Sequence, residues 1–323
     1  MTLIATAVRL HRRGSLAVLA LLGGLAGPAR LAAEPSRLPA RGLGGLLAVE
    51  VEYRAHKLIF SSDTKAEIEL ASPETVREAL QAAPLGTPVP LPDRVARLTV
   101  ETSLPFGRRE VVRIMLDPHT GRALQAEKVV TGRSPERVVS RYLNEGIYVW
   151  RSSPADRREE KLRPDLWTER RERFSPYPAD LPKDAVVTDG YALVPLAEAA
   201  RLDRPGARLR LYVLARRGLL ALDFTPQGLA SREVELEELG LSARRVRSGR
   251  ELVRLVRISA HGVSGGAAAA PDDLRVLGFK GAVTLAVDAA TGVPVAITGR
   301  ADYIGTLTAE LVRVRYAADA PAR

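Results

Sequence analysis

The sequence predicts a mainly β protein, a curved antiparallel sheet or half-open β-barrel with two short helices. Three observations lead to this prediction. Apolar and polar residues alternate along many short segments, which is the period of strands with one face on a core. Turn residues separate these segments, and only two stretches have the character of a helix. The 323 residues are 46% hydrophobic, which suffices for one large core.

The clearest strand pattern lies near the C-terminus, where residues 281–316 predict a three-stranded antiparallel meander. The first turn, Asp288–Gly292, has the form D-x-x-T-G, in which Asp caps the turn and Gly supplies a positive φ. A second turn of this form, Asp117–Gly121, divides residues 94–130. The residues around the first turn that alternate as a core face are Val283, Leu285, Val287, Val293, Val295 and Ile297.

Residues 1–33 have the composition of an export signal. A basic start with Arg9, Arg12 and Arg13 precedes an apolar run at 15–26 that is too short to span a bilayer, and small residues follow it. Cleavage would remove four arginines and no acid, which lowers the net charge from +10 to +6. We therefore expect a periplasmic or secreted protein, exported by the general or the twin-arginine route.

The rest of the chain divides into a linker at 34–45, a single β-rich domain at 46–317 and a C-terminal tail at 318–323. Ser72, as N-cap before Pro73, predicts a short helix that ends near residue 83, and residues 193–202 predict a second. Besides the C-terminal meander, strands are expected within residues 46–70, 94–130, 136–143, 147–151, 208–215, 219–224, 233–239 and 250–259. The sequence Thr-Pro-Gln-Gly at 225–228 predicts a hairpin turn.

A charged segment interrupts the strands, with seven basic and six acidic residues between Asp156 and Arg173. Such a segment is typical of a solvated loop with a turn or two of helix. Its apolar residues Trp167 and Phe174, with Tyr177 beyond them, allow a second interpretation, in which the segment is a lid over a cavity.

No catalytic or metal-binding motif of this sequence has the surrounding residues that its chemistry requires. The absence of cysteine excludes disulfides, thiolate metal sites and Cys nucleophiles. Residues 262–266 read G-x-S-x-G beside His261, but Pro271 leaves no room for the required helix and no His follows Ser264. An S-x-x-K match at 62–65 runs into a strand pattern rather than a helix. The three histidines beyond the signal show no metal-ligand spacing.

Two charge patterns remain. Carboxylates two residues apart recur at 50/52, 67/69 and 233/235/237. On a strand such carboxylates lie about 7 Å apart, which is near the separation of the catalytic pair in glycosidases. The same pattern is also typical of a solvated sheet face. The densest basic run could contact anionic lipid headgroups, or could protect a sheet edge from strand addition. It begins with Arg244, Arg245, Arg247 and Arg250. No motif indicates nucleic acid.

The domain resembles a family of exported bacterial proteins of unknown function that is broadly similar to the LolA and LolB lipoprotein carriers. Three segments carry the resemblance: the opening strand with Tyr53–Lys57, Asp189–Leu193 together with Pro205–Gly206, and 281–311 with Val293-Pro294-Val295 and Ile304-Gly305. The resemblance covers most of residues 46–317 and departs at 156–173 and 262–270. It implies a concave apolar sheet face that could hold a lipid or acyl chain, and it implies no catalytic residue.

The leading functional hypothesis is a non-enzymatic cell-envelope protein that binds a lipid, or the acyl chain of a lipoprotein, without a cofactor or metal. It would have at most peripheral contact with a membrane and could have an envelope protein partner. The expected ligand-binding residues are Val283, Leu285, Val287, Val295, Ile297, Trp167 and Phe174. A dry packed core explains the first five equally well. The alternatives are a periplasmic structural or protein-interaction module and, third, an envelope hydrolase.

Overall fold

A computed structural model describes residues 38, 42–57, 60–204, 206–240, 244–263, 270–301 and 305–317, all within one compact unit, Pro35–Arg323. The predicted export signal at 1–33 and the tail at 318–323 lie outside the described residues, as does Ser264. In the described part of the chain, no helix is long and apolar enough to cross a membrane.

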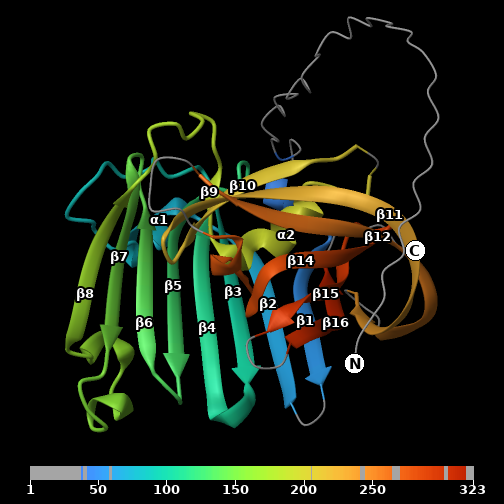
Figure 1. Ribbon diagram of the computed structural model, residues 1–323, viewed down its shortest axis with the longest axis horizontal. Helices are drawn as coiled ribbons and strands as arrows, with labels where there is room; N and C mark the ends of the chain where they lie inside the picture. Colours follow the sequence, from blue (N-terminus) through green and yellow to red (C-terminus); the bar gives the residue numbers. More distant parts are fainter. Residues whose placement is uncertain are drawn as a thin grey trace, which may run out of the picture. The chain divides into compact units, whose positions relative to one another are not determined.

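The described chain forms one large curved sheet, which confirms the predicted mainly β class (Figure 1). All neighbouring pairs are antiparallel except β9–β10 and an additional β11–β16 pairing. The strands are β1 (Ala48–Lys57), β2 (Phe60–Ala71), β3 (Val95–Leu104), β4 (Arg108–Leu116), β5 (Ala123–Thr131), β6 (Glu136–Tyr142), β7 (Gly146–Ser153), β8 (Glu169–Pro176), β9 (Val187–Thr188), β10 (Leu209–Ala215), β11 (Gly218–Leu239), β12 (Arg244–Gly262), β13 (Arg275–Val276), β14 (Phe279–Asp288), β15 (Pro294–Ala301) and β16 (Gly305–Tyr316).

The sheet runs in the order β8-β7-β6-β5-β4-β3-β2-β1-β16-β15-β14-β12-β11-β10-β9, and β13 pairs with β14. Its first half, β8 to β2, follows the chain backwards, and each strand pairs antiparallel with the next one in sequence. In the second half, β11 reaches round to pair with β16, so that β11, β12, β14, β15 and β16 close a ring that is not a true barrel (Figure 1). The predicted C-terminal meander is present as β14, β15 and β16.

Two short helices lie on opposite faces of the sheet. We call the face that carries Tyr53 the inner face, and the other the outer face. Helix α1 (Pro73–Ala79) begins at the predicted N-cap Ser72 and packs Val76 on the outer face. Helix α2 (Leu193–Ala199) lies on the inner face, and all its residues except Pro195 are buried. Short 3-10 helices occur at Gly42–Gly45, Pro105–Gly107, Glu159–Lys161, Pro164–Leu166, Gly190–Ala192 and Pro271–Asp273.

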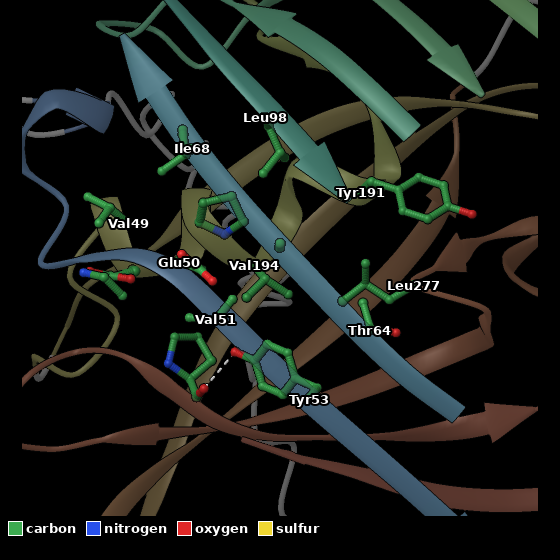
Figure 2. Close-up of a pocket in the computed structure, with 15 residues that line it drawn as sticks. Val49, Glu50, Val51, Tyr53, Thr64, Ile68, Leu98, Tyr191, Val194 and Leu277 are labelled. Carbon is green, nitrogen blue, oxygen red and sulfur yellow. Dashed lines mark hydrogen bonds between the residues drawn. The ribbon is translucent and has the colours of Figure 1, made fainter. Parts of the chain in front are cut away.

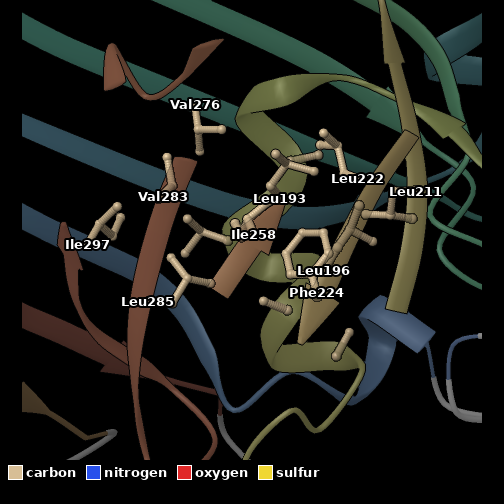
Figure 3. Close-up of a cluster of buried hydrophobic side chains, with 14 of the residues drawn as sticks. Leu193, Leu196, Leu211, Leu222, Phe224, Ile258, Val276, Val283, Leu285 and Ile297 are labelled. Atoms are coloured by element: carbon tan, nitrogen blue, oxygen red, sulfur yellow. The ribbon is translucent and has the colours of Figure 1, made fainter. Parts of the chain in front are cut away.

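The main core lies between α2 and the ring. Figure 3 shows Leu193 and Leu196 of α2 among apolar side chains from the surrounding strands, including Phe224 of β11 and Leu285 of β14. The N-terminal part of the domain joins this core, because Leu38 and Leu43 are also buried in it. The described end of the predicted linker at 34–45 therefore packs against the domain.

The two D-x-x-T-G turns adopt the same hydrogen-bond pattern. In each, the Asp Oδ1 accepts from the backbone N–H groups two and three residues later, at 2.8 and 3.4 Å for Asp117 and at 2.8 and 3.0 Å for Asp288. The closing glycines, Gly121 and Gly292, have φ values of +78° and +82°. The shared sequence therefore specifies one local structure in two different parts of the sheet.

Replacing Asp117 with Ala should lower the free energy of unfolding by about 1 kcal/mol, because the two turn N–H groups lose their side-chain acceptor. Urea unfolding of the variant measures this change. His119→Ala, in the same turn, is the control, because His119 is exposed and only its backbone N–H serves the turn. Equal stability of the two variants would contradict the predicted role of Asp117.

The predicted hairpin turn at 225–228 is wrong. Strand β11 continues through these residues, and both of its halves pair with the single long strand β12. The register shifts between Pro226 and Leu229, so the extra residues form a bulge. Pro and Gly are as characteristic of a bulge in a strand as of a turn, and only the length of the partner strand distinguishes the two.

The predicted loop or lid at 156–173 is also wrong in part. After two 3-10 turns the segment becomes β8, which forms one edge of the sheet. Phe174 of β8 is opposite Tyr148 of β7, and their rings lie 6.4 Å apart on the outer face. The strand was missed because its charged residues hide the period of two, as an edge strand exposes both faces.

Candidate functional site: a trough beneath strands β1 and β2

Two neighbouring cavities lie on the inner face of β1 and β2. Both are shallow and open to solvent, with cavity volumes of about 30 Å³ for the first and about 90 Å³ for the second. Both are lined by Tyr53, Thr64 and Leu277, so they are two parts of one depression. We call this depression the trough.

The register of the sheet explains why the trough is apolar. Tyr53 of β1 is opposite Thr64 of β2, and Val51 is opposite Ala66, so alternate residues of both strands face inward. Helix α2 contributes Val194 to the opposite wall of the first cavity (Figure 2). The lining residues of the first cavity are Ala48, Val49, Glu50, Val51, Tyr53, Thr64, Ala66, Ile68, Leu98, Tyr191, Val194, Pro195, Glu198, Leu277 and Pro294.

The second cavity continues toward the end of β1 and the beginning of β16. Its side chains are mostly apolar, but Lys57 at its rim donates to the carbonyl of Thr306 at 2.8 Å. The lining residues are Tyr53, Ala55, Lys57, Ser61, Ser62, Thr64, Leu104, Pro105, Leu277, Gly278, Phe279, Ile297, Ala301, Leu307 and Ala309.

Tyr53 stands at the junction of the two cavities. Its side chain is buried, and its hydroxyl donates to the carbonyl of Pro294 at 2.7 Å (Figure 2). Burial, and then the nearby charge of Glu198, raise the pKa of Tyr53 far above its usual value. Tyr53 is therefore a neutral, fixed wall of the trough.

Glu198 is the buried carboxyl of the trough, with 5% of its surface exposed. Its Oε1 accepts from the backbone N–H groups of Leu47 at 2.8 Å and Ala48 at 3.1 Å. Burial raises the pKa of Glu198 to about 7, although these two N–H groups and the charge of Arg201 lower it. Near neutral pH this side chain therefore exchanges a proton inside an apolar cavity.

A second buried polar cluster borders the first cavity. Tyr191 donates from its hydroxyl to the carboxylate of Glu110, which is also buried. Asp189 caps the short helix Gly190–Ala192 through the N–H of Tyr191 and accepts from the hydroxyl of Tyr142 at 3.2 Å. Burial raises the pKa of Asp189. These groups bind one another, and they close the trough on this side.

Most of the predicted ligand-binding residues lie in the packed core. Val283, Leu285, Val287 and Val295 are at most 4% exposed and do not line the trough. Figure 3 shows Val283 and Leu285 beside α2, which covers the inner face of the ring. Only Ile297 lines a cavity, the second one.

The two predicted aromatic ligand contacts lie far from the trough. Trp167 is 1% exposed, and its Nε1 donates to the carbonyl of Glu159 at 2.9 Å. Phe174 belongs to β8, which is seven strands from β1 in the sheet, and points to the outer face. Neither side chain can contact a ligand in the trough.

The predicted basic contact surface is paired with the acidic residues of the neighbouring strand. Arg244 forms an ion pair with Glu237, and Arg250 pairs with Glu233 at 3.2 Å. Arg245 is exposed opposite Glu238. The basic run and the acidic run at 233–237 therefore face each other across β11 and β12.

Arg247 differs from the other residues of the basic run because its side chain is only 9% exposed. Its Nη2 donates to Asp288 Oδ2 at 2.5 Å, and its Nη1 is 3.6 Å from Glu238. Arg247 therefore belongs to the interior of the ring and is not part of a surface for anionic headgroups.

The other candidate chemistry does not converge on the trough. His261 Nε2 lies 2.9 Å from Asp223, which also accepts two hydrogen bonds from Arg210. Lys65 of the S-x-x-K match lies on β2 and forms an ion pair with Glu50 at 2.6 Å. Among the described residues, no group of three or more His, Cys, Asp or Glu side chains is arranged to hold a metal ion.

Sequence reasoning missed Glu198 and the trough. The available indication was the composition of 193–199, Leu-Val-Pro-Leu-Ala-Glu-Ala, in which one carboxyl stands alone in an apolar helix.

Comparison of the chain with protein-family models, curated proteins and solved structures finds no match.

Proposed function

We propose that this chain is a non-enzymatic binding protein of the cell envelope that holds the acyl chain of an amphiphilic molecule in the trough. The observation that carries the proposal is the trough itself, a largely apolar depression beside the packed core around α2. The envelope location rests on the predicted export signal at 1–33.

The physical basis of binding would be the removal of acyl surface from water, at about 25 cal/mol per Å². The wall is largely formed before a ligand arrives, because Tyr53 is fixed by its bond to Pro294 and Val194 lies on the buried helix α2. A preformed wall reduces the ordering cost of binding.

Native mass spectrometry of residues 34–323, purified from a bacterial periplasm without detergent, tests this proposal directly. The expected result is a lipid or fatty-acid adduct in a one-to-one ratio, identified by organic extraction of the same sample. A bare mass that takes up neither fatty acid nor phospholipid on titration would rule the proposal out.

Filling the trough should prevent binding. Ala66→Phe places a ring into the first cavity from β2, and we expect at least about a tenfold loss of affinity for a fatty acid. Ala282→Phe is the matched control, because it introduces the same side chain at an exposed position of β14. Fluorescence displacement measures affinity, and urea unfolding of both variants excludes a general loss of structure. Equal affinities of the two folded variants would contradict a ligand in the first cavity.

A second candidate is a protein-interaction module, which one surface feature favours. Leu229 of β11 and Leu252 of β12 are 52% and 53% exposed. The register places them diagonally on one face of the long β11–β12 hairpin. A pull-down from an envelope extract that depends on Leu229 and Leu252, with no lipid adduct on the purified protein, would favour this candidate.

A further inference from the structure

We propose that Glu198 is the polar anchor of the trough and selects ligands whose polar end presents a hydrogen-bond acceptor oxygen, such as an ester or acid carbonyl. This inference rests on the proposed function, because it names the ligand class of the same cavity. Glu198 would act as a neutral acid that donates its O–H to the ligand.

The hydrogen bonds that Glu198 makes within the protein determine which of its two carboxyl oxygens can bind a ligand. Oε1 accepts from two backbone N–H groups, Leu47 and Ala48, which occupy both lone pairs of a carbonyl oxygen. Within the described part of the chain, Oε2 makes no hydrogen bond. In a neutral carboxyl held this way, the O–H is on Oε2 and has no protein acceptor.

The other polar side chains of the first cavity are already bonded. Tyr53 donates to Pro294 and Tyr191 donates to Glu110. The Oγ1 atoms of Thr64 and Thr102 lie 3.1 Å apart in a shared hydrogen bond. Glu50 pairs with Lys65 and Arg315. Among the carboxyl and phenol groups of this lining, Glu198 is therefore the one whose O–H a ligand can use.

The electrostatic surroundings favour the neutral acid below pH 7. The charged and titratable groups that face Glu198 are Tyr53 of β1 and, beyond α2, Arg201 and Asp203. Arg201 forms a bidentate ion pair with Asp203, with hydrogen bonds of 2.9 and 2.8 Å. The carboxylate of Asp203 therefore offsets much of the effect of the Arg201 charge on Glu198. Burial dominates, and it raises the pKa of Glu198 to about 7.

A cationic ligand is the competing possibility, since an ionised Glu198 could bind an ammonium group. The wall around it argues against this, because Val51, Ile68 and Leu98 supply no second acceptor for a desolvated cation. A carbonyl oxygen carries no full charge and needs only one donor there. The geometry therefore favours an acceptor over a cation.

The test compares methyl decanoate with decylamine at pH 5.5 and pH 8.5, by fluorescence displacement on the full mature chain. The wild-type protein should bind the ester about tenfold more tightly at pH 5.5, since one hydrogen bond of about 1.4 kcal/mol is lost on ionisation. Glu198→Gln keeps an N–H donor at both pH values, so its affinity for the ester should not depend on pH. Glu78→Gln, on the exposed side of α1, is the matched control and should behave as wild type.

The outcomes separate the inference from the proposed function. If both probes bind but neither pH nor Glu198→Gln changes the affinity for the ester, Glu198 is not the anchor, although the trough still binds ligands. If decylamine binds more tightly than the ester at both pH values, the selected class is cationic and the inference is overturned. If neither probe binds any variant, the proposed function fails and the inference fails with it.

Discussion

Replacing Arg247 with Met is expected to lower the free energy of unfolding by about 3–5 kcal/mol, the usual cost of removing one partner from a buried ion pair. The guanidinium of Arg247 donates to Asp288 at 2.5 Å, and Asp288 is only 2% exposed. Met matches the length of the Arg stem, so little packing volume is lost. What remains is a buried carboxylate that has lost its ion pair with Arg247.

The Arg247–Asp288 pair lies where several strands of the ring meet, so its loss should destabilise more than one strand. Asp288 ends β14, and its Oδ1 holds the following turn through the N–H groups of Ala290 and Thr291. Arg247 is also 3.6 Å from Glu238, whose Oε1 accepts from the hydroxyl of Tyr316 on β16. The cluster thus connects β12, β14 and β11 close to the parallel β11–β16 pairing that closes the ring.

Arg250→Met is the matched control, because Arg250 lies on the same strand and also forms an ion pair. That pair, with Glu233, is mostly exposed, with side-chain exposures of 75% and 72%, and we expect a change below about 1 kcal/mol. Urea unfolding at pH 7, followed by circular dichroism, measures both variants. Arg247→Met combined with Asp288→Asn should recover part of the loss, since Asn keeps the turn acceptor but carries no charge.

A loss no larger than that of Arg250→Met would show that the buried pair is energetically neutral. A double variant no more stable than Arg247→Met would show that the charge of Asp288 is not the source of the loss. Asn retains the Oδ1 acceptor of the turn, whereas the ion pair uses Oδ2, so the double variant tests the charge and not the turn.

Local patterns predicted most elements of the fold. Ser72 with Pro73 specified α1, the D-x-x-T-G sequences specified two turns, and the alternation at 283–297 specified two strands of the final meander. These features depend on neighbours in the chain, so the sequence contains them directly. The bulge at Pro226–Leu229 was mistaken for a turn because its identity depends on β12, about thirty residues away.

The trough could not be predicted because it depends on which inner-face residues α2 leaves uncovered. Leu285 and Val51 have the same strand periodicity, but Leu285 is packed in the α2 core whereas Val51 lines a cavity. Only the packing of α2 against particular strands distinguishes them. The same is true of Arg247, which differs from Arg250 in burial and not in any local sequence feature.

Glu198→Gln is expected to stabilise the protein at pH 8 relative to wild type, by up to about 3 kcal/mol. The folded pKa of Glu198 is about 7, against an ordinary value of 4.5. Because the folded pKa is raised, the contribution of Glu198 to stability is fully present below pH 4.5. It is lost as the pH rises toward about 7, and Gln has no charge to lose.

Urea unfolding of both proteins at pH 4.5 and pH 8 measures this difference. Subtracting wild type from Glu198→Gln at each pH cancels the contribution of the other titrating groups, including the histidines. Glu78→Gln should give no such trend, because Glu78 is exposed on α1. A stability difference that is the same at both pH values would mean that Glu198 is not neutral in the folded protein at pH 4.5, or not ionised at pH 8.

The substitution also separates the structural role of Glu198 from its proposed role in binding. The amide oxygen of Gln can accept from Leu47 and Ala48 as Oε1 of Glu198 does, so the connection between α2 and the start of β1 is retained. A carboxyl at this position costs stability at neutral pH and adds nothing to that connection. What the carboxyl adds is an acidic proton inside the trough. A ligand that accepts a hydrogen bond from this O–H would hold Glu198 neutral, and so would offset the loss of stability that ionisation causes.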